Sequence, residues 1–97
     1  AIELINITST VNIVNTHFGT TTLDGNQATT AGGAIRMTAS ATGSLTIDTT
    51  SSFIGNKTTA VGSDGGAIFA TTLGSMSVSG STFTSNSSLD QGGAIRA

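Results

Sequence analysis

The tetrapeptide Gly32-Gly33-Ala34-Ile35 occurs again at residues 65–68 and 92–95 of this 97-residue chain. The isoleucines that end these copies lie 33 and 27 residues apart, and Ile2 lies 33 residues before the first of them. Spacings of about 20 to 50 residues are typical of proteins built from stacked repeats. The sequence therefore predicts a chain that returns to the same structural position about once every 30 residues.

A second marker recurs beside the tetrapeptide. Asparagine stands at three positions that are 30 residues apart, Asn26, Asn56 and Asn86. The second and third follow a phenylalanine by three positions, Phe53 and Phe83. Two markers in one phase indicate repeated units of the same local structure.

The first repeat departs from this pattern in the segment before its asparagine. Either Leu23 replaces the phenylalanine three places before Asn26, or Phe18 is the equivalent and an insertion extends through Asp24. The sequence leaves both alignments open.

The composition favours strands and excludes several classes of protein. Charged residues make up 8% of the chain, against about a quarter in typical domains, and the net charge is −2. This balance argues against a nucleic-acid partner. Serine and threonine account for about a third of the residues, and threonine favours extended backbone. The longest apolar run, residues 67–70, is far too short to span a membrane.

Each unit contains short alternating segments rather than a helical pattern. Leu45 and Ile47 alternate with polar residues, as Met76 and Val78 do at the matching place and as residues 11 and 13 do in the first unit. We expect three short strands in each unit and almost no helix. Stacking such units pairs each strand in parallel with its homologue, at a spacing of about 4.8 Å.

The predicted fold is therefore all-β, a right-handed parallel β-helix of about three coils with 27–33 residues each. We assign coil 1 to residues 1–33, coil 2 to residues 34–66 and coil 3 to residues 67–93, with a fourth coil starting at residues 94–97. The sequence resembles a fragment of a longer repeat region.

Four kinds of structural ladder follow from this stacking. Isoleucines that end the tetrapeptides should form an inward column, namely Ile2, Ile35, Ile68 and Ile95. Paired glycines should form the corners where the backbone turns closely, namely Gly32, Gly33, Gly65, Gly66, Gly92 and Gly93. The recurring asparagines should bond along the stack, and Phe53 should stack on Phe83, with Leu23 or Phe18 completing the aromatic column.

The residue after each of these isoleucines predicts a column on the outer face. Its members are Glu3, Arg36, Phe69 and Arg96. Arginine beside an aromatic residue is common at interfaces, so this is a possible contact column. Alternatively, Glu3 and Arg36 form an ordinary surface ion pair and Phe69 covers the flank of the stack.

The paired Gly-Gly-Ala-Ile and Phe-x-x-Asn motifs resemble those of the chlamydial-type polymorphic outer-membrane-protein repeats, over essentially the whole chain. The resemblance implies a right-handed β-helix in the surface-exposed passenger region of an autotransporter, with a role in adhesion. The first repeat departs from the family pattern because it lacks a clean Phe-x-x-Asn.

The titratable residues do not predict a catalytic or metal site. The four aspartates, Asp24, Asp48, Asp64 and Asp90, share no common phase, and the nearest pair, Asp64 and Asp90, is expected to be solvated at a corner. His17 is the only histidine and there is no cysteine, so we expect no metal and no other cofactor. The Gly-Gly elements lack the aspartate of calcium-binding β-helix repeats.

These observations predict a non-enzymatic, extracellular or cell-surface module, structural or adhesive, within an adhesin or a surface fibre. Its partners would be a protein or glycan on a host or neighbouring cell, or a second copy bound through the coil ends. One alternative is a segment of a polysaccharide-active β-helix enzyme whose catalytic coils lie outside this chain. A second is an ice-binding β-helix, although Thr20–22 and Thr82–84 do not recur in one phase.

Overall fold

The computed structural model describes residues 2–40 and 42–97, and these residues form strands without any helix. The strands are β1 (Ile2–Ile7), β2 (Thr10–Val14), β3 (His17–Phe18), β4 (Gln27–Ala28), β5 (Ile35–Ala39), β6 (Ser44–Asp48), β7 (Ser52–Ile54), β8 (Lys57–Thr58), β9 (Ile68–Thr71), β10 (Ser75–Val78), β11 (Thr82–Thr84) and β12 (Ile95–Arg96). The all-β prediction is confirmed.

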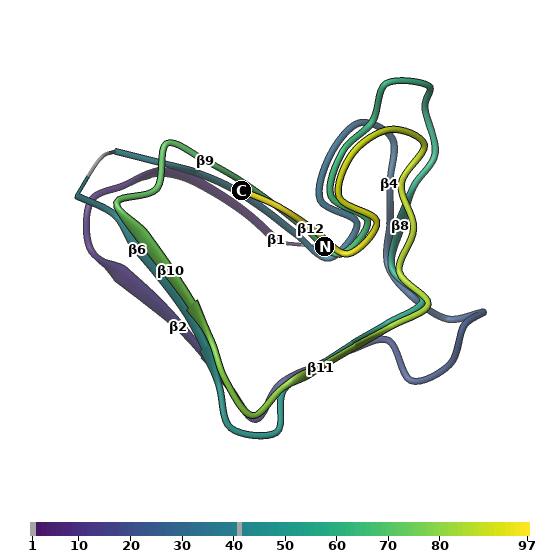
Figure 1. The fold of residues 1–97 in the computed structure, drawn as a ribbon, viewed down its shortest axis with the longest axis horizontal. Coiled ribbons are helices and arrows are strands. Elements are labelled where there is room, and N and C mark those ends of the chain that lie inside the picture. The colour runs from purple at the N-terminus through teal and green to yellow at the C-terminus, as the bar shows by residue number, and fades with distance from the viewer. Residues whose placement is uncertain (1, 41) are drawn as a thin grey trace.

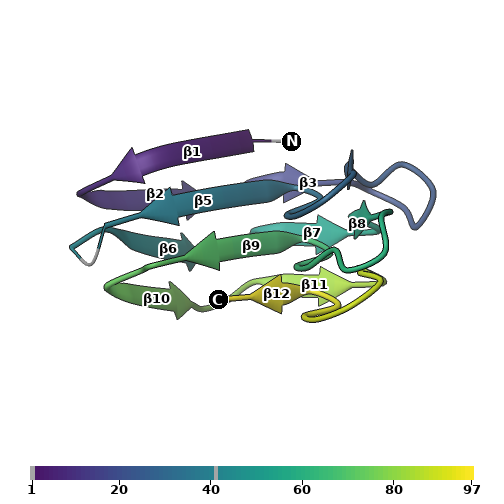
Figure 2. The ribbon, with the colours of Figure 1, turned by 90° about the horizontal axis from the view of Figure 1, so that it is seen from above.

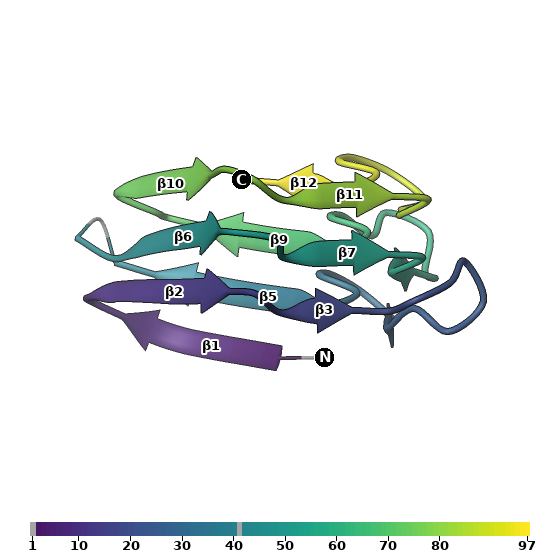
Figure 3. The same cartoon turned by 90° about the horizontal axis from the view of Figure 1, so that it is seen from below.

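Every paired strand runs parallel to its neighbour, and the neighbours come from successive repeats. The sheets have the strand orders β1-β5-β9-β12, β2-β6-β10, β3-β7-β11 and β4-β8. Figure 1 looks along the stack, where the coils superimpose on one contour, and Figures 2 and 3 show them from opposite sides. The molecule measures 17 Å along this axis, consistent with a few coils at about 4.8 Å each. The chain is a parallel β-helix.

The fourth sheet differs from the three strands per unit that the sequence predicts. It consists of β4 and β8, and a further parallel bridge joins Lys57 to Ser87. Two-residue strands are too short to show an alternating pattern. Their pairing comes from the stacking of the coils on either side.

The isoleucine column lies in the sheet of β1, β5, β9 and β12. Ile35 pairs with Ile2 and with Ile68, and Ile68 pairs with Ile95. Ile35 and Ile68 are fully buried, whereas Ile2 on the edge strand β1 is 39% exposed. A coil on each side is thus needed to bury this position completely.

The aromatic column contains Phe18 rather than Leu23. The Phe18 and Phe53 ring centroids lie 4.8 Å apart, and those of Phe53 and Phe83 lie 4.7 Å apart with nearly parallel planes. Leu23 is 96% exposed in a loop. The first repeat therefore contains an insertion between its phenylalanine and Asn26.

The three asparagines form a hydrogen-bonded ladder at one corner. The Asn26 backbone N–H and side-chain amide both donate to Asn56 Oδ1, at 2.9 and 3.0 Å. The corresponding groups of Asn56 donate to Asn86 Oδ1, both at 3.0 Å. The amides of Asn56 and Asn86 also donate to the carbonyl oxygens of Phe18 and Phe53, at 2.8 Å. Asn56 is fully buried, and its polar atoms are satisfied by these bonds.

The two glycines of each tetrapeptide meet different requirements. Gly65 has a φ of 61°, which favours glycine, and a side chain there would also clash with the Ile68 carbonyl oxygen. Gly66 has no such φ, but a side chain on it would clash with the Gly93 carbonyl oxygen of the next coil. The first glycine makes the turn, and the second allows the coils to stack closely.

Candidate contact surface

The four residues of the contact column lie in register on the sheet of β1, β5, β9 and β12. Arg36 pairs with Glu3 and with Phe69, and Phe69 pairs with Arg96. Because alternate residues of a strand point to opposite faces, residues beside the inward isoleucines face outward. Phe69 is half-buried, so part of its ring is covered and part remains accessible. The column is a row of two guanidinium groups with a partly covered ring between them.

Both arginines of this column form ion pairs. Arg36 Nη1 lies 3.1 Å from Glu3 Oε1, and the two side chains are 48% and 54% exposed. Arg96 Nη1 lies 2.6 Å from Asp64 Oδ2, and there the aspartate is only 17% exposed. Asp64 also accepts a hydrogen bond from the Gln91 N–H at 3.1 Å. The expectation of a solvated corner at Asp64 is therefore wrong, because Arg96 reaches back over the neighbouring coil and covers it.

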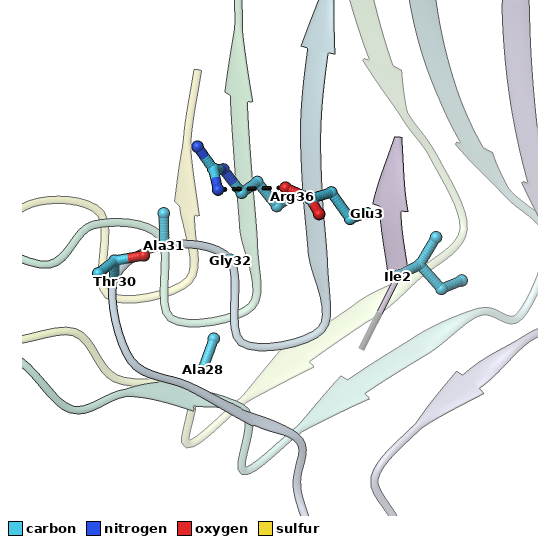
Figure 4. Close-up of a pocket in the computed structure, with 7 residues that line it drawn as sticks. All are labelled: Ile2, Glu3, Ala28, Thr30, Ala31, Gly32 and Arg36. Carbon is cyan, nitrogen blue, oxygen red and sulfur yellow. Dashed lines mark hydrogen bonds and ion pairs between the residues drawn. The ribbon is translucent and has the colours of Figure 1, made fainter. Parts of the chain in front are cut away.

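A pocket of about 210 Å³ opens beside the first ion pair. Figure 4 shows Glu3 and Arg36 bonded to each other on one side, with the arc of residues 28–32 on the other. The arc contributes small side chains, including those of Thr30 and Ala31. The two charged groups that line this hollow are thus already paired with each other.

The aspartates are engaged separately rather than together. The Thr20 hydroxyl is the first of several donors that lower the pKa of Asp24 to about 2, followed by the N–H groups of Thr21 and Thr20. The Ser79 hydroxyl and the Thr49 N–H lower the pKa of Asp48. Both of these carboxylates are stabilised in their ionised form by donors close to them. Such an arrangement holds turns in place and does not provide a shared proton.

His17 lies on the outer face of β3. Its Nδ1 atom is 2.6 Å from the hydroxyl oxygen of Ser52 on the next coil. Within the part of the chain that the structure describes, no group of three or more histidine, cysteine or acidic side chains could hold a metal ion. The described residues also include no helix long and apolar enough to cross a membrane.

Sequence reasoning missed the ion pair between Asp64 and Arg96 and the outward path of the loop after Phe18. The only signal for the pair is that Asp64 directly precedes Gly65, a place held by Ala31 and Gln91 in the other coils. The signal for the loop is the spacing of eight positions between Phe18 and Asn26, against three between Phe53 and Asn56.

Comparison with protein families gives one match. The family model of the Chlamydia polymorphic membrane protein repeat matches three segments, residues 20–37, 50–71 and 80–97, which together cover more than half of the chain. Each segment includes one Gly-Gly-Ala-Ile copy. No curated protein and no solved structure matches the chain.

Proposed function

Because the chain belongs to the Chlamydia polymorphic membrane protein repeat family, we propose that it is a non-enzymatic β-helix module of an outer-membrane or cell-surface adhesin. The family assignment supports a surface location. The ladders account for the inward side chains, so the outer faces and loops are the parts left for contact with a partner. The role of the β-helix in this proposal is to hold those outer residues at fixed positions.

The observation that carries the adhesive role is the column of Glu3, Arg36, Phe69 and Arg96. Strand pairing fixes its four positions, and the neighbouring coils hold Phe69 in place between Arg36 and Arg96. Aromatic and arginine side chains are enriched at binding hot spots. A protein or glycan on a host or neighbouring cell is the partner that this row would bind.

The replacement Phe69→Ser tests the column. We expect saturation binding of the fluorescently labelled chain to cultured epithelial cells to weaken about tenfold, the effect of losing a moderate hot spot. Thr82→Ala, which alters an exposed position on β11, is the matched control. Circular dichroism and thermal melting establish that both variants keep the fold. Unchanged cell binding of Phe69→Ser would remove the column from the proposal.

Treatment of the cells then separates the two partner classes. Loss of binding after protease treatment alone supports a protein partner, and loss after enzymatic deglycosylation supports a glycan.

Association through the coil ends is a second form of the proposal, and the sheets constrain it. The sheets of β2-β6-β10 and β3-β7-β11 have three strands, but the sheet that begins with β1 has a fourth, β12. A second copy stacked in register on β10 and β11 would bring its own β1 to the place of β12. We therefore expect a variant without residues 94–97 to self-associate more strongly in sedimentation experiments. A lower association constant would contradict this form.

A further inference from the structure

Backbone hydrogen bonds at the double-glycine corner give the stack a direction. The N–H of Gly32 donates to the Asp64 carbonyl oxygen in the next coil at 3.1 Å, and the N–H of Gly65 donates to the Gln91 carbonyl oxygen at 2.9 Å. The second glycine of each pair repeats the pattern one position later, at 3.3 and 3.0 Å. At this corner, each coil therefore donates to the coil that follows it and accepts from the coil that precedes it.

The two ends of the stack consequently carry complementary groups at this corner. Within the described residues, the N–H groups of Gly92 and Gly93 have no hydrogen-bond acceptor, and the carbonyl oxygens of Ala31 and Gly32 have no donor. Figure 2 shows β1 at one end of the stack, and β10 and β12 at the other. Unlike ends match donors with acceptors, whereas two like ends would leave both sets of backbone groups unpaired.

The pocket beside Arg36 lies at the acceptor end. Ala31 and Gly32, whose carbonyl oxygens lack a donor, are among the residues that line it. Between coils, the same space is closed by the packing of one corner on the next, because a Cβ added to Gly66 would lie 2.0 Å from the Gly93 carbonyl oxygen. The pocket therefore lies where a further double-glycine corner would stack.

The ion pairs of the two arginines indicate the same occupant. Arg96 bonds to Asp64, which directly precedes a double glycine in the coil before it. Arg36 is the counterpart of Arg96 two strands away in the same sheet, and it bonds to Glu3 of β1 instead. Both side chains of that pair are about half exposed, so exchange of Glu3 for another acceptor costs little.

We propose that a second copy of this chain seats its last double-glycine corner, residues 90–93, in this pocket, so that the copies associate head to tail. The inference rests on the association through the coil ends proposed above, and it adds the direction and the register. The two glycine N–H groups of the incoming corner donate to the Ala31 and Gly32 carbonyl oxygens. The Gln91 side chain accepts from Arg36, in the place that Asp64 takes relative to Arg96.

This contact joins two unlike surfaces, so each added copy leaves one free surface of each kind. Such a heterologous contact produces an open filament unless its rotation closes a ring. Strand β12 limits the growth, because in the copy that supplies the corner it occupies the place of the incoming β1. It has only two residues, Ile95 and Arg96, which pair with β9 and are partly exposed.

Cysteine cross-linking tests the direction, since the chain contains no cysteine of its own. Ala31→Cys and Gln91→Cys each place one thiol at one end, and stacking would bring the two positions to about 4.8 Å. A short bismaleimide should link the two variants when they are mixed, and neither variant alone should give a dimer. Deletion of residues 94–97 should raise the yield several-fold in the Gln91→Cys chain, but not in the Ala31→Cys chain.

Val61→Cys is the matched control, because Val61 is 96% exposed but lies in the loop before the middle corner. Mixed with Gln91→Cys, it should give no dimer, and circular dichroism should show the same fold for all variants. Dimers of Ala31→Cys alone or of Gln91→Cys alone would overturn the head-to-tail direction. Association in sedimentation without the mixed product would overturn the register, whereas no association at all would overturn the contact through the coil ends itself.

Discussion

Asn56 and Asp24 both hold a turn with side-chain hydrogen bonds, but Asn56 bonds to neighbouring coils whereas Asp24 bonds only within its own loop. Asn56 is fully buried, and its partners include Asn26, Asn86 and the Phe18 carbonyl. Asp24 is exposed, and its partners are no more than four residues away. A buried amide shared between coils requires the same residue at each level. A local carboxylate allows one coil to differ without disturbing the others.

The difference in burial also explains why Asn56 is a neutral amide and Asp24 a charged carboxylate. An ionised group inside the stack would be expensive to bury, and the neutral amide both donates and accepts along the axis. An exposed carboxylate can remain ionised while it accepts from several N–H and O–H groups, which is why the pKa of Asp24 is lowered to about 2. The repeated corner is therefore insensitive to acid, and the single loop is sensitive to it.

Removal of the Phe53 ring should give the largest effect, because the ring is fully buried between two others. We expect Phe53→Ala to lower the free energy of unfolding by about 3–5 kcal/mol, as measured by urea denaturation. Phe83→Ala should cost less, since Phe83 is half-buried and stacks on one ring only. Equal losses at the two positions would show that the rings do not form a stack.

Asn56→Ala should lower the free energy of unfolding by about 3 kcal/mol, because several buried donors and acceptors lose their partner. Asn12→Ala is the matched control, since Asn12 is exposed on β2, and it should change stability by less than about 0.5 kcal/mol. Thermal or urea unfolding measures both. A similar, small effect of the two replacements would contradict the role of the ladder.

Gly55→Ala connects the two regions, because Gly55 precedes the ladder asparagine and lies under the 19–25 loop. Its φ of 68° alone costs alanine roughly 1–2 kcal/mol, and the new methyl group would also displace Thr21 and Thr22. Gly80→Ala is the control, because Gly80 has a similar φ of 54° but a Cβ added there would lie 3.7 Å from the nearest atom, in the Thr49 backbone. We expect faster proteolysis of the 19–25 loop only in Gly55→Ala. Equal cleavage of the two variants would argue against packing of the loop on Gly55.

The smallest effect concerns pH and is confined to the loop. The folded-state pKa of Asp24 lies below its ordinary value of 3.8, so its contribution is present above about pH 4 and is lost as the pH falls towards 2. NMR should show the Thr20 and Thr21 amide signals shifting over this range in the parent chain but not in Asp24→Asn. Titration centred at or above pH 4 would contradict the hydrogen bonds to the ionised carboxylate.

The sequence predicts the ladders well because their requirements recur with the coil. A turn at positive φ, a stacked amide and a buried isoleucine each demand a particular residue type, so Gly65, Asn56 and Ile68 have visible counterparts. The alignment of Phe18 is hidden by an insertion whose length no repeat rule fixes. The family pattern, too, says nothing of side chains that occur in one coil only.

Other features depend on contacts between coils that no single repeat displays. The strands β4 and β8 form because adjacent coils bring their backbones together, although neither has an alternating pattern. The pair of Asp64 with Arg96 depends on the direction in which a long side chain crosses the neighbouring coil. Exposure of Leu23 likewise follows from the path of the loop. Sequence periodicity thus predicts the inside of the stack better than its surface.

Backbone NMR of the β2, β6 and β10 strands tests most directly whether the chain returns to the same position in every coil. The structure predicts parallel-strand nuclear Overhauser effects that connect Leu45 with Val11 on one side and with Met76 on the other. Antiparallel contacts of β6 with β5 or β7, its neighbours along the chain, would contradict the β-helix and the surfaces built on it.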